Sequence, residues 1–110
     1  MRFFEDLSHT KLSVSIPHLI RGPVVYIHTA ALIDNWINNL YSKKETKSVI
    51  SRRKILEIIM NEPGFLAHSS SRRISGKVFR CSVFKLEESS KALLTIIEKE
   101  RVKNESNRIQ

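Results

Sequence analysis

The sequence predicts one small α+β domain, and two kinds of pattern indicate this class. Alternating or β-branched runs predict strands near residues 10–16 and within 65–86, while apolar residues at helical spacing predict helices between and after them. The chain has 110 residues, of which 41% are hydrophobic and 27% charged, as in ordinary globular domains. We therefore expect residues 1–103 to form a single domain and 104–110 a flexible polar tail.

The first predicted strand covers residues 10–16, where apolar and polar residues alternate with the period of a half-buried strand. Pro17 ends this strand. A second β-branched run at residues 24–27 follows an Arg-Gly-Pro turn signal. This run is either a second strand or the lead into the next helix.

Three segments have apolar residues three and four positions apart, which is typical of one buried helical face. They predict helices at about residues 29–41, 51–61 and 87–103. Trp36 is expected to anchor the first helix in the core. A capping serine begins the second helix, and two glutamates suit the positive N-terminal end of the third.

Residues 65–86 predict a β-hairpin. Its second strand is the aromatic and β-branched run at 78–84, which pairs with a first strand at 64–68. The residues between the two strands are basic and are expected to form a long tip. Helix, loop, helix and basic hairpin follow one another as in winged-helix domains, which contain a helix-turn-helix. We therefore expect a winged-helix-like fold, with residues 51–61 as the recognition helix.

The positive charge is concentrated in the middle of the chain. The net charge is +8, and residues 43–85 hold eleven basic and three acidic side chains, whose balance equals that whole charge. Such a stretch attracts polyanions. We therefore expect binding of nucleic acid, with duplex DNA favoured, in transcription regulation or in replication and recombination.

Ten basic residues form the predicted nucleic-acid site. Three lie in the loop, three at the start of the recognition helix and four on the hairpin: Lys43, Lys44, Lys47, Arg52, Arg53, Lys54, Arg72, Arg73, Lys77 and Arg80. Few aromatic residues interleave with them, which disfavours single-strand binding by stacking.

The start of the recognition helix carries an electrostatic conflict. Arg52, Arg53 and Lys54 crowd its predicted first turn, where each cation opposes the helix dipole by ~0.3–1 kcal/mol. A phosphate bound there would turn the conflict into an anion site. Alternatively, the three residues precede the helix and no conflict exists.

Enzymatic and cofactor chemistry are not expected. The three glycines form no phosphate-cradling motif, and the four histidines and one cysteine lack metal-ligand spacing. Cys81 lies mid-strand, where an inert buried thiol is expected. A single cysteine, no apolar run long enough for a membrane span and no leader-like N-terminus favour an intracellular, cytoplasmic or nuclear, protein.

Several alternatives remain open. The main alternative to nucleic-acid binding is a protein-interaction subunit of a larger complex. Such a subunit would bind its partner, or a second copy of itself in a homodimer, through the apolar stripe of helix 87–103. A small nuclease would need clustered acids or histidines. Residues 72–75 match an arginine-directed phosphorylation pattern ending at Ser75, and phosphate there would weaken DNA binding. The basic cluster at 43–54 also suits a nuclear address.

Overall fold

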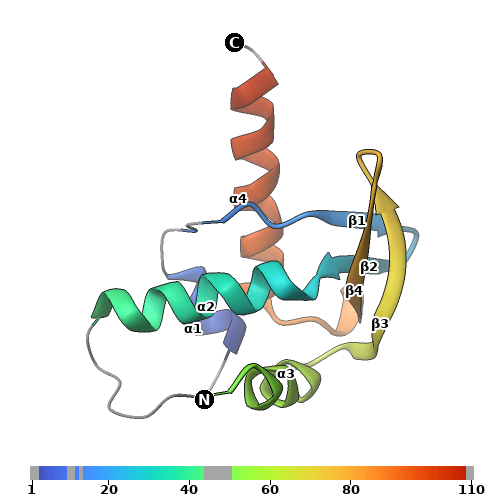
Figure 1. Cartoon of the computed structure of the whole chain (residues 1–110). Helices are drawn as coiled ribbons and strands as arrows, with labels where there is room; N and C mark the ends of the chain where they lie inside the picture. The colour runs from blue at the N-terminus through green and yellow to red at the C-terminus, as the bar shows by residue number, and fades with distance from the viewer. Residues whose placement is uncertain (1–2, 10–11, 13, 44–50, 109–110) are drawn as a thin grey trace.

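The computed structural model describes residues 3–9, 12, 14–43 and 51–108, and it describes their side chains except at 39–43 and 102–108. It contains four α-helices and four strands (Figure 1). In chain order these are α1 (Phe3–Ser8), β1 (His18–Arg21), β2 (Val24–His28), α2 (Thr29–Lys43), α3 (Arg52–Met60), β3 (Phe65–Ile74), β4 (Lys77–Lys85), a 3-10 turn η1 (Leu86–Glu88) and α4 (Lys91–Arg108).

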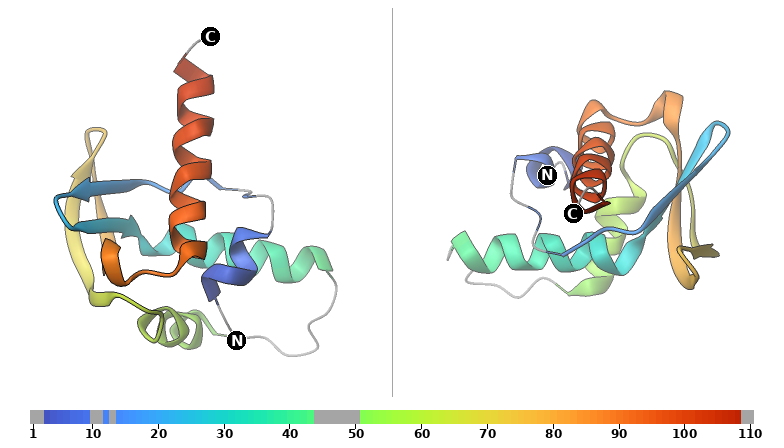
Figure 2. Two further views of the ribbon diagram at one scale, coloured as in Figure 1. Left: turned by 180° about the vertical axis from the view of Figure 1, so that it is seen from behind. Right: turned by 90° about the horizontal axis from the view of Figure 1, so that it is seen from above.

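The strands form one antiparallel sheet in the order β1-β2-β4-β3, so the predicted α+β class is confirmed. The helices gather on one side of the sheet (Figure 2). On that side, Val25 of β2 lies opposite Phe84 of β4, and both side chains are fully buried. Ile27 and Ser82 form the next pair on the same face and are also buried. The helices therefore cover the central strands β2 and β4.

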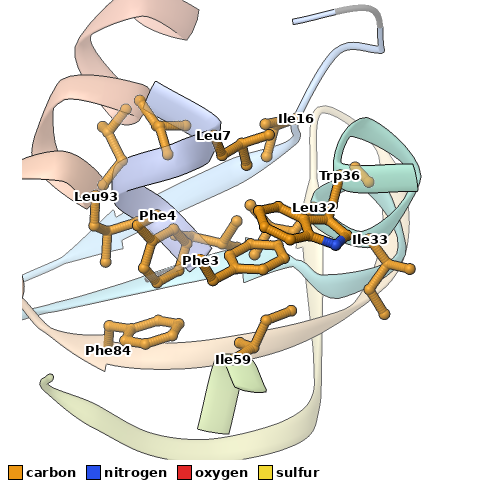
Figure 3. Close-up of a cluster of buried hydrophobic side chains, with 14 of the residues drawn as sticks. Phe3, Phe4, Leu7, Ile16, Leu32, Ile33, Trp36, Ile59, Phe84 and Leu93 are labelled. Carbon is orange, nitrogen blue, oxygen red and sulfur yellow. The ribbon is translucent and has the colours of Figure 1, made fainter. Parts of the chain in front are cut away.

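Aromatic side chains form the centre of the core (Figure 3). Phe3 of α1 stacks on Trp36 of α2 with ring centroids 5.0 Å apart, which confirms Trp36 as a core anchor. Phe4 meets Phe84 edge to face at 5.2 Å. Ile59 of α3 and several aliphatic residues of α4 complete the same cluster. The core thus joins all four helices to the sheet.

The predicted strand at residues 10–16 is wrong in its described part. Residues 12 and 14–16 belong to no strand, and 10, 11 and 13 lie outside the described residues. The backbone of Val14 bonds instead to the Asn35 side chain, whose Oδ1 accepts from the Val14 N–H at 3.0 Å and whose Nδ2 donates to the Val14 carbonyl at 2.9 Å. The buried side-chain amide of Asn35 on α2 therefore makes the hydrogen bonds to Val14 that a neighbouring strand would otherwise make.

The run at residues 24–27 agrees with both interpretations of the sequence. It forms strand β2, and β2 leads directly into α2 at Thr29. The first strand of the sheet is β1, which pairs with β2 as a hairpin around Gly22, whose φ is +56°. Helix α1 was not predicted.

Two of the three predicted helices have the expected positions. Helices α2 and α3 match the segments 29–41 and 51–61 closely. The third helix begins later than predicted, because Glu87 lies in η1 and α4 begins at Lys91. Ser90 caps α4 by accepting a hydrogen bond from Leu93 N–H at 3.3 Å. The helix continues to Arg108, beyond the predicted end at 103.

The apolar stripe of α4 faces the core. Leu93 and Ile96 are fully buried, and Ile97 is 9% exposed. These side chains pack in the same cluster as Phe3 and Phe4. The stripe that the sequence offers to a partner is therefore covered by the domain itself.

The predicted hairpin is present, but its long basic tip is not. Strands β3 and β4 are joined by Ser75 and Gly76 alone. Their φ angles are +52° and +86°, the signature of a tight two-residue turn of the type that matches strand twist. The hairpin cations therefore lie on the strands, where the pairing register decides which face each one occupies.

No helix in the described part of the chain is long and apolar enough to cross a bilayer.

We expect Phe3→Ala to lower the free energy of unfolding by ~3–5 kcal/mol, because it removes a fully buried ring from the centre of the core. Urea unfolding followed by Trp36 fluorescence measures the change. Leu94→Ala, at a 41% exposed position on α4, is the control and should cost much less. Equal losses in the two variants would contradict the central role of α1.

Candidate nucleic-acid interface

A hollow of about 340 Å³ lies between the N-terminal parts of α2 and α3 and the β3–β4 hairpin. Two arginines line it, Arg52 of α3 and Arg80 of β4, together with two histidines, His28 of β2 and His68 of β3. Ile33 and Leu56 contribute apolar surface from the two helices. No acidic residue is among the described residues that line it. We call this feature the basic hollow.

The first turn of α3 places Arg52 at the basic hollow. Ser51 caps the helix, because its Oγ accepts a hydrogen bond from Lys54 N–H at 3.1 Å. Arg52, Arg53 and Lys54 are therefore the first three residues of α3, and the alternative that they precede the helix is wrong. The conflict with the helix dipole is real.

Nearby carboxylates offset part of this conflict. Arg52 Nη1 lies 2.8 Å from Asp34 Oδ1 on α2, and both side chains are about half exposed, at 54% and 45%. Lys54 Nζ lies 3.8 Å from Glu57 Oε2. The Arg53 side chain is exposed and makes no hydrogen bond or ion pair with another described residue. Within the described part of the chain, no carboxylate pairs with its charge at the helix start.

A bulge in β3 places His68 at the basic hollow. The register with β4 shifts between Phe65 and Ala67 and again between Ala67 and Ser70. Inside the bulge, Ser69 has a φ of +60°, a conformation that side chains other than glycine and asparagine rarely adopt. His68 Nδ1 lies 3.0 Å from Ser69 Oγ. Bulges commonly redirect side chains in this way beside binding sites.

The hairpin register divides the predicted cations between two faces. Arg80 lies opposite Ser71 and alternates with Ser82 and Phe84, so it occupies the face that the helices cover. Arg73, opposite Val78, shares that face. The side chains of both arginines make no hydrogen bond or ion pair with another described residue.

Arg72 and Lys77 occupy the opposite face of the hairpin, because they alternate with Arg73 and Val78. The Arg72 guanidinium lies over the Tyr26 ring, 4.5 Å from its centroid. Its Nη2 also donates to Tyr26 Oη at 3.0 Å. Arg72 is therefore engaged with the domain's own sheet.

The structure thus brings together part of the predicted site. Arg52 and Arg80 line one hollow, with Arg73 on the same hairpin face and Arg53 in the same helical turn. Arg72 and Lys77 lie apart from them. The side chain of Lys43, and the whole of Lys44 and Lys47, lie outside the described residues.

Sequence reasoning missed the contribution of His68 and Ser69. The sequence predicts His68 at the end of the first hairpin strand and Ser69 in the tip that follows it, and nothing in an isolated histidine indicates a bulge. The sequence also gives no sign that Ser69 adopts a positive φ. The bulge is evident only from the pairing of β3 with β4, and the lining of the basic hollow places both residues beside α3.

Burial shifts the pKa of two groups near the interface. Burial lowers the pKa of His28, and the Asp34 carboxylate partly opposes this shift. The His28 ring lies against Phe79, with centroids 4.7 Å apart. Burial likewise raises the pKa of the Cys81 thiol, while the charge of Arg72 acts in the opposite direction. Cys81 is fully buried, as the sequence predicts.

Among the residues that the structure describes, no three histidine, cysteine, aspartate or glutamate side chains form a group that could hold a metal ion.

No family model matches the sequence, and no curated protein or solved structure matches it either.

We expect Arg72→Ala to lower the free energy of unfolding by ~0.5–1 kcal/mol, because it removes an exposed cation–π contact with Tyr26. Thermal unfolding measures this change. Arg73→Ala, at the neighbouring position on the other face, is the matched control and should change stability less. A larger loss in the control would contradict the assignment of faces.

We expect the free energy of unfolding to fall as the pH drops below the ordinary histidine value of 6.5, in part because partial burial lowers the pKa of His28 in the folded chain. The unfolded chain binds a proton in this range more readily than the folded chain, so acid favours unfolding. Urea unfolding at a series of pH values measures the slope. His28→Gln should show a smaller slope, and an unchanged slope would refute the contribution of His28.

Proposed function

We propose that this chain binds nucleic acid, with duplex DNA favoured, through the surface formed by the first turn of α3 and the helix-side face of the hairpin. The observation that carries the proposal is the basic hollow, where Arg52 and Arg80 come from opposite walls and no described lining residue is acidic. We call Arg52, Arg53, His68, Arg73 and Arg80 the α3–hairpin surface.

The charge at the start of α3 supports an anionic partner. Three cations in one first turn are unfavourable for the isolated helix. A phosphate at this end would accept hydrogen bonds from free backbone N–H groups and guanidinium groups together. Arg53 is free for such a contact among the described residues, whereas Arg52 is already oriented by Asp34.

The order of elements supports a winged-helix-like arrangement. Strand β2, helices α2 and α3, and the β3–β4 hairpin follow one another as in winged-helix domains. In the sheet, β4 lies between β2 and β3, so the hairpin is beside the strand that precedes the helices. In this arrangement α3 is the recognition helix and the hairpin is the wing.

Because the hairpin cations lie on two opposite faces, only some of them can belong to one binding surface. Arg73 and Arg80 lie on the face toward α3, so they suit contact with the same duplex as Arg53. Arg72 is occupied by Tyr26 on the other face. We therefore retain Arg52, Arg53, Arg73 and Arg80 as nucleic-acid contacts, and assign Arg72 to the stability of the hairpin.

Fluorescence anisotropy with labelled duplex DNA, single-stranded DNA and structured RNA at several salt concentrations tests the proposal. We expect duplex affinity to fall as salt rises, because phosphate contacts release counterions. Arg80→Ala and Arg53→Ala should each reduce the salt slope by about 1. Lys91→Ala, an exposed cation at the start of α4, is the matched control and should leave the slope unchanged.

Two outcomes would contradict the proposal. Affinity weaker than micromolar for all three nucleic acids at ~50 mM salt would favour the protein-interaction alternative, since electrostatic binding is strongest at low salt. An equal loss in Lys91→Ala and Arg80→Ala would show that net charge, rather than the α3–hairpin surface, determines binding.

A further inference from the structure

The basic hollow is lined by apolar as well as basic side chains, and contacts to phosphates do not require the apolar ones. Contacts to the phosphates of a duplex need only cations and hydrogen-bond donors that reach the backbone oxygens. Here the two arginines stand beside a recess whose walls include the apolar side chains Ile33 and Leu56. Both come from helices: Ile33 belongs to the hydrophobic core cluster, and Leu56 is partly buried. Apolar walls with a few convergent polar groups are typical of a site for a small organic moiety.

The size and polarity of the hollow match one nucleotide. Its volume of about 340 Å³ lies at the small end of the ligand sites found in proteins. Arg52 and Arg80 supply guanidinium groups for a phosphate. Thr29 and Ser69 also line the hollow. Their hydroxyl groups lie 2.6 Å from Ser82 Oγ and 3.0 Å from His68 Nδ1 respectively, and each hydroxyl retains capacity for a further hydrogen bond to a base edge or to the sugar.

The strain in β3 is located at this hollow. Ser69 holds a left-handed conformation within the bulge, and both His68 and Ser69 line the recess. A strained residue of this kind persists where the surrounding structure requires its geometry, often at a ligand site. An unbulged strand would not present these two consecutive residues to α3.

We propose that the basic hollow receives one unpaired nucleotide of the bound nucleic acid, with its base against Ile33 and Leu56 and its phosphate between Arg52 and Arg80. This proposal rests on the proposed function and adds a substrate class to it. A duplex that carries an unpaired nucleotide, at an overhanging end, is then bound more tightly than a blunt duplex of the same sequence.

Anisotropy titrations with a blunt duplex and with the same duplex carrying a single-nucleotide 5′ overhang test this inference. We expect the overhang to increase affinity by about tenfold, the gain expected from burying part of one base against apolar side chains. Leu56→Trp fills the recess and should abolish this gain while the affinity for the blunt duplex stays within about twofold. Leu66→Trp, at an exposed position of β3 outside the hollow, is the matched control and should retain the gain.

The possible outcomes separate this inference from the proposed function. Salt-dependent binding of both duplexes with equal affinity would overturn the inference and leave the proposed function standing. Absence of binding to either duplex would overturn both. A gain that survives in Leu56→Trp, or that is lost in Leu66→Trp, would place the unpaired nucleotide elsewhere. Should Leu56→Trp fail to fold by circular dichroism, Ala30→Leu narrows the recess from the α2 side and decides in the same way.

Discussion

The stacking of Phe3 on Trp36 is the contact on which the rest of the arrangement depends. It joins α1 to α2, and the edge-to-face contact of Phe4 with Phe84 joins α1 to the central strand β4. Ile55 and Ile59 of α3 pack into the same cluster. The core therefore fixes where α3 lies relative to β4. Because the proposed interface takes its cations from α3 and from the hairpin that contains β4, its geometry depends on the packing of these apolar side chains.

Strand β4 connects the core to the proposed interface, because alternate side chains along it face the helices. Phe84 and Ser82 face the helices at one end of the strand, and Arg80 continues on the same face toward the hairpin turn. Where β2 ends at His28, the chain turns into α2, and the hairpin extends past it. The space left between the hairpin and the helix starts is the basic hollow. One end of β4 therefore packs in the core, and the other end places Arg80 at the basic hollow.

The helices were predictable where their apolar faces are long, and the remaining errors have physical causes. The fifteen-residue helix α2 and the nine-residue helix α3 show a clear period, whereas six-residue α1 is too short for one. The alternation at residues 10–16 imitates a strand, because the sequence does not show that the Asn35 amide takes the place of a neighbouring strand. The sequence also shows how many cations the hairpin carries. It cannot show that Arg72 and Arg80 lie on opposite faces, or that a bulge aims His68 at α3, because both depend on the register with β4.

The central claim is that one face, shared by α3 and the hairpin, contacts nucleic acid. Mapping of backbone amide NMR shifts during titration with a short DNA duplex tests it most directly. The account predicts that the largest shifts occur at residues 52–56 and 68–80, with little change at 91–101 of α4. Shifts concentrated on α1 and α4 would contradict the account, and so would the absence of any shift at low salt.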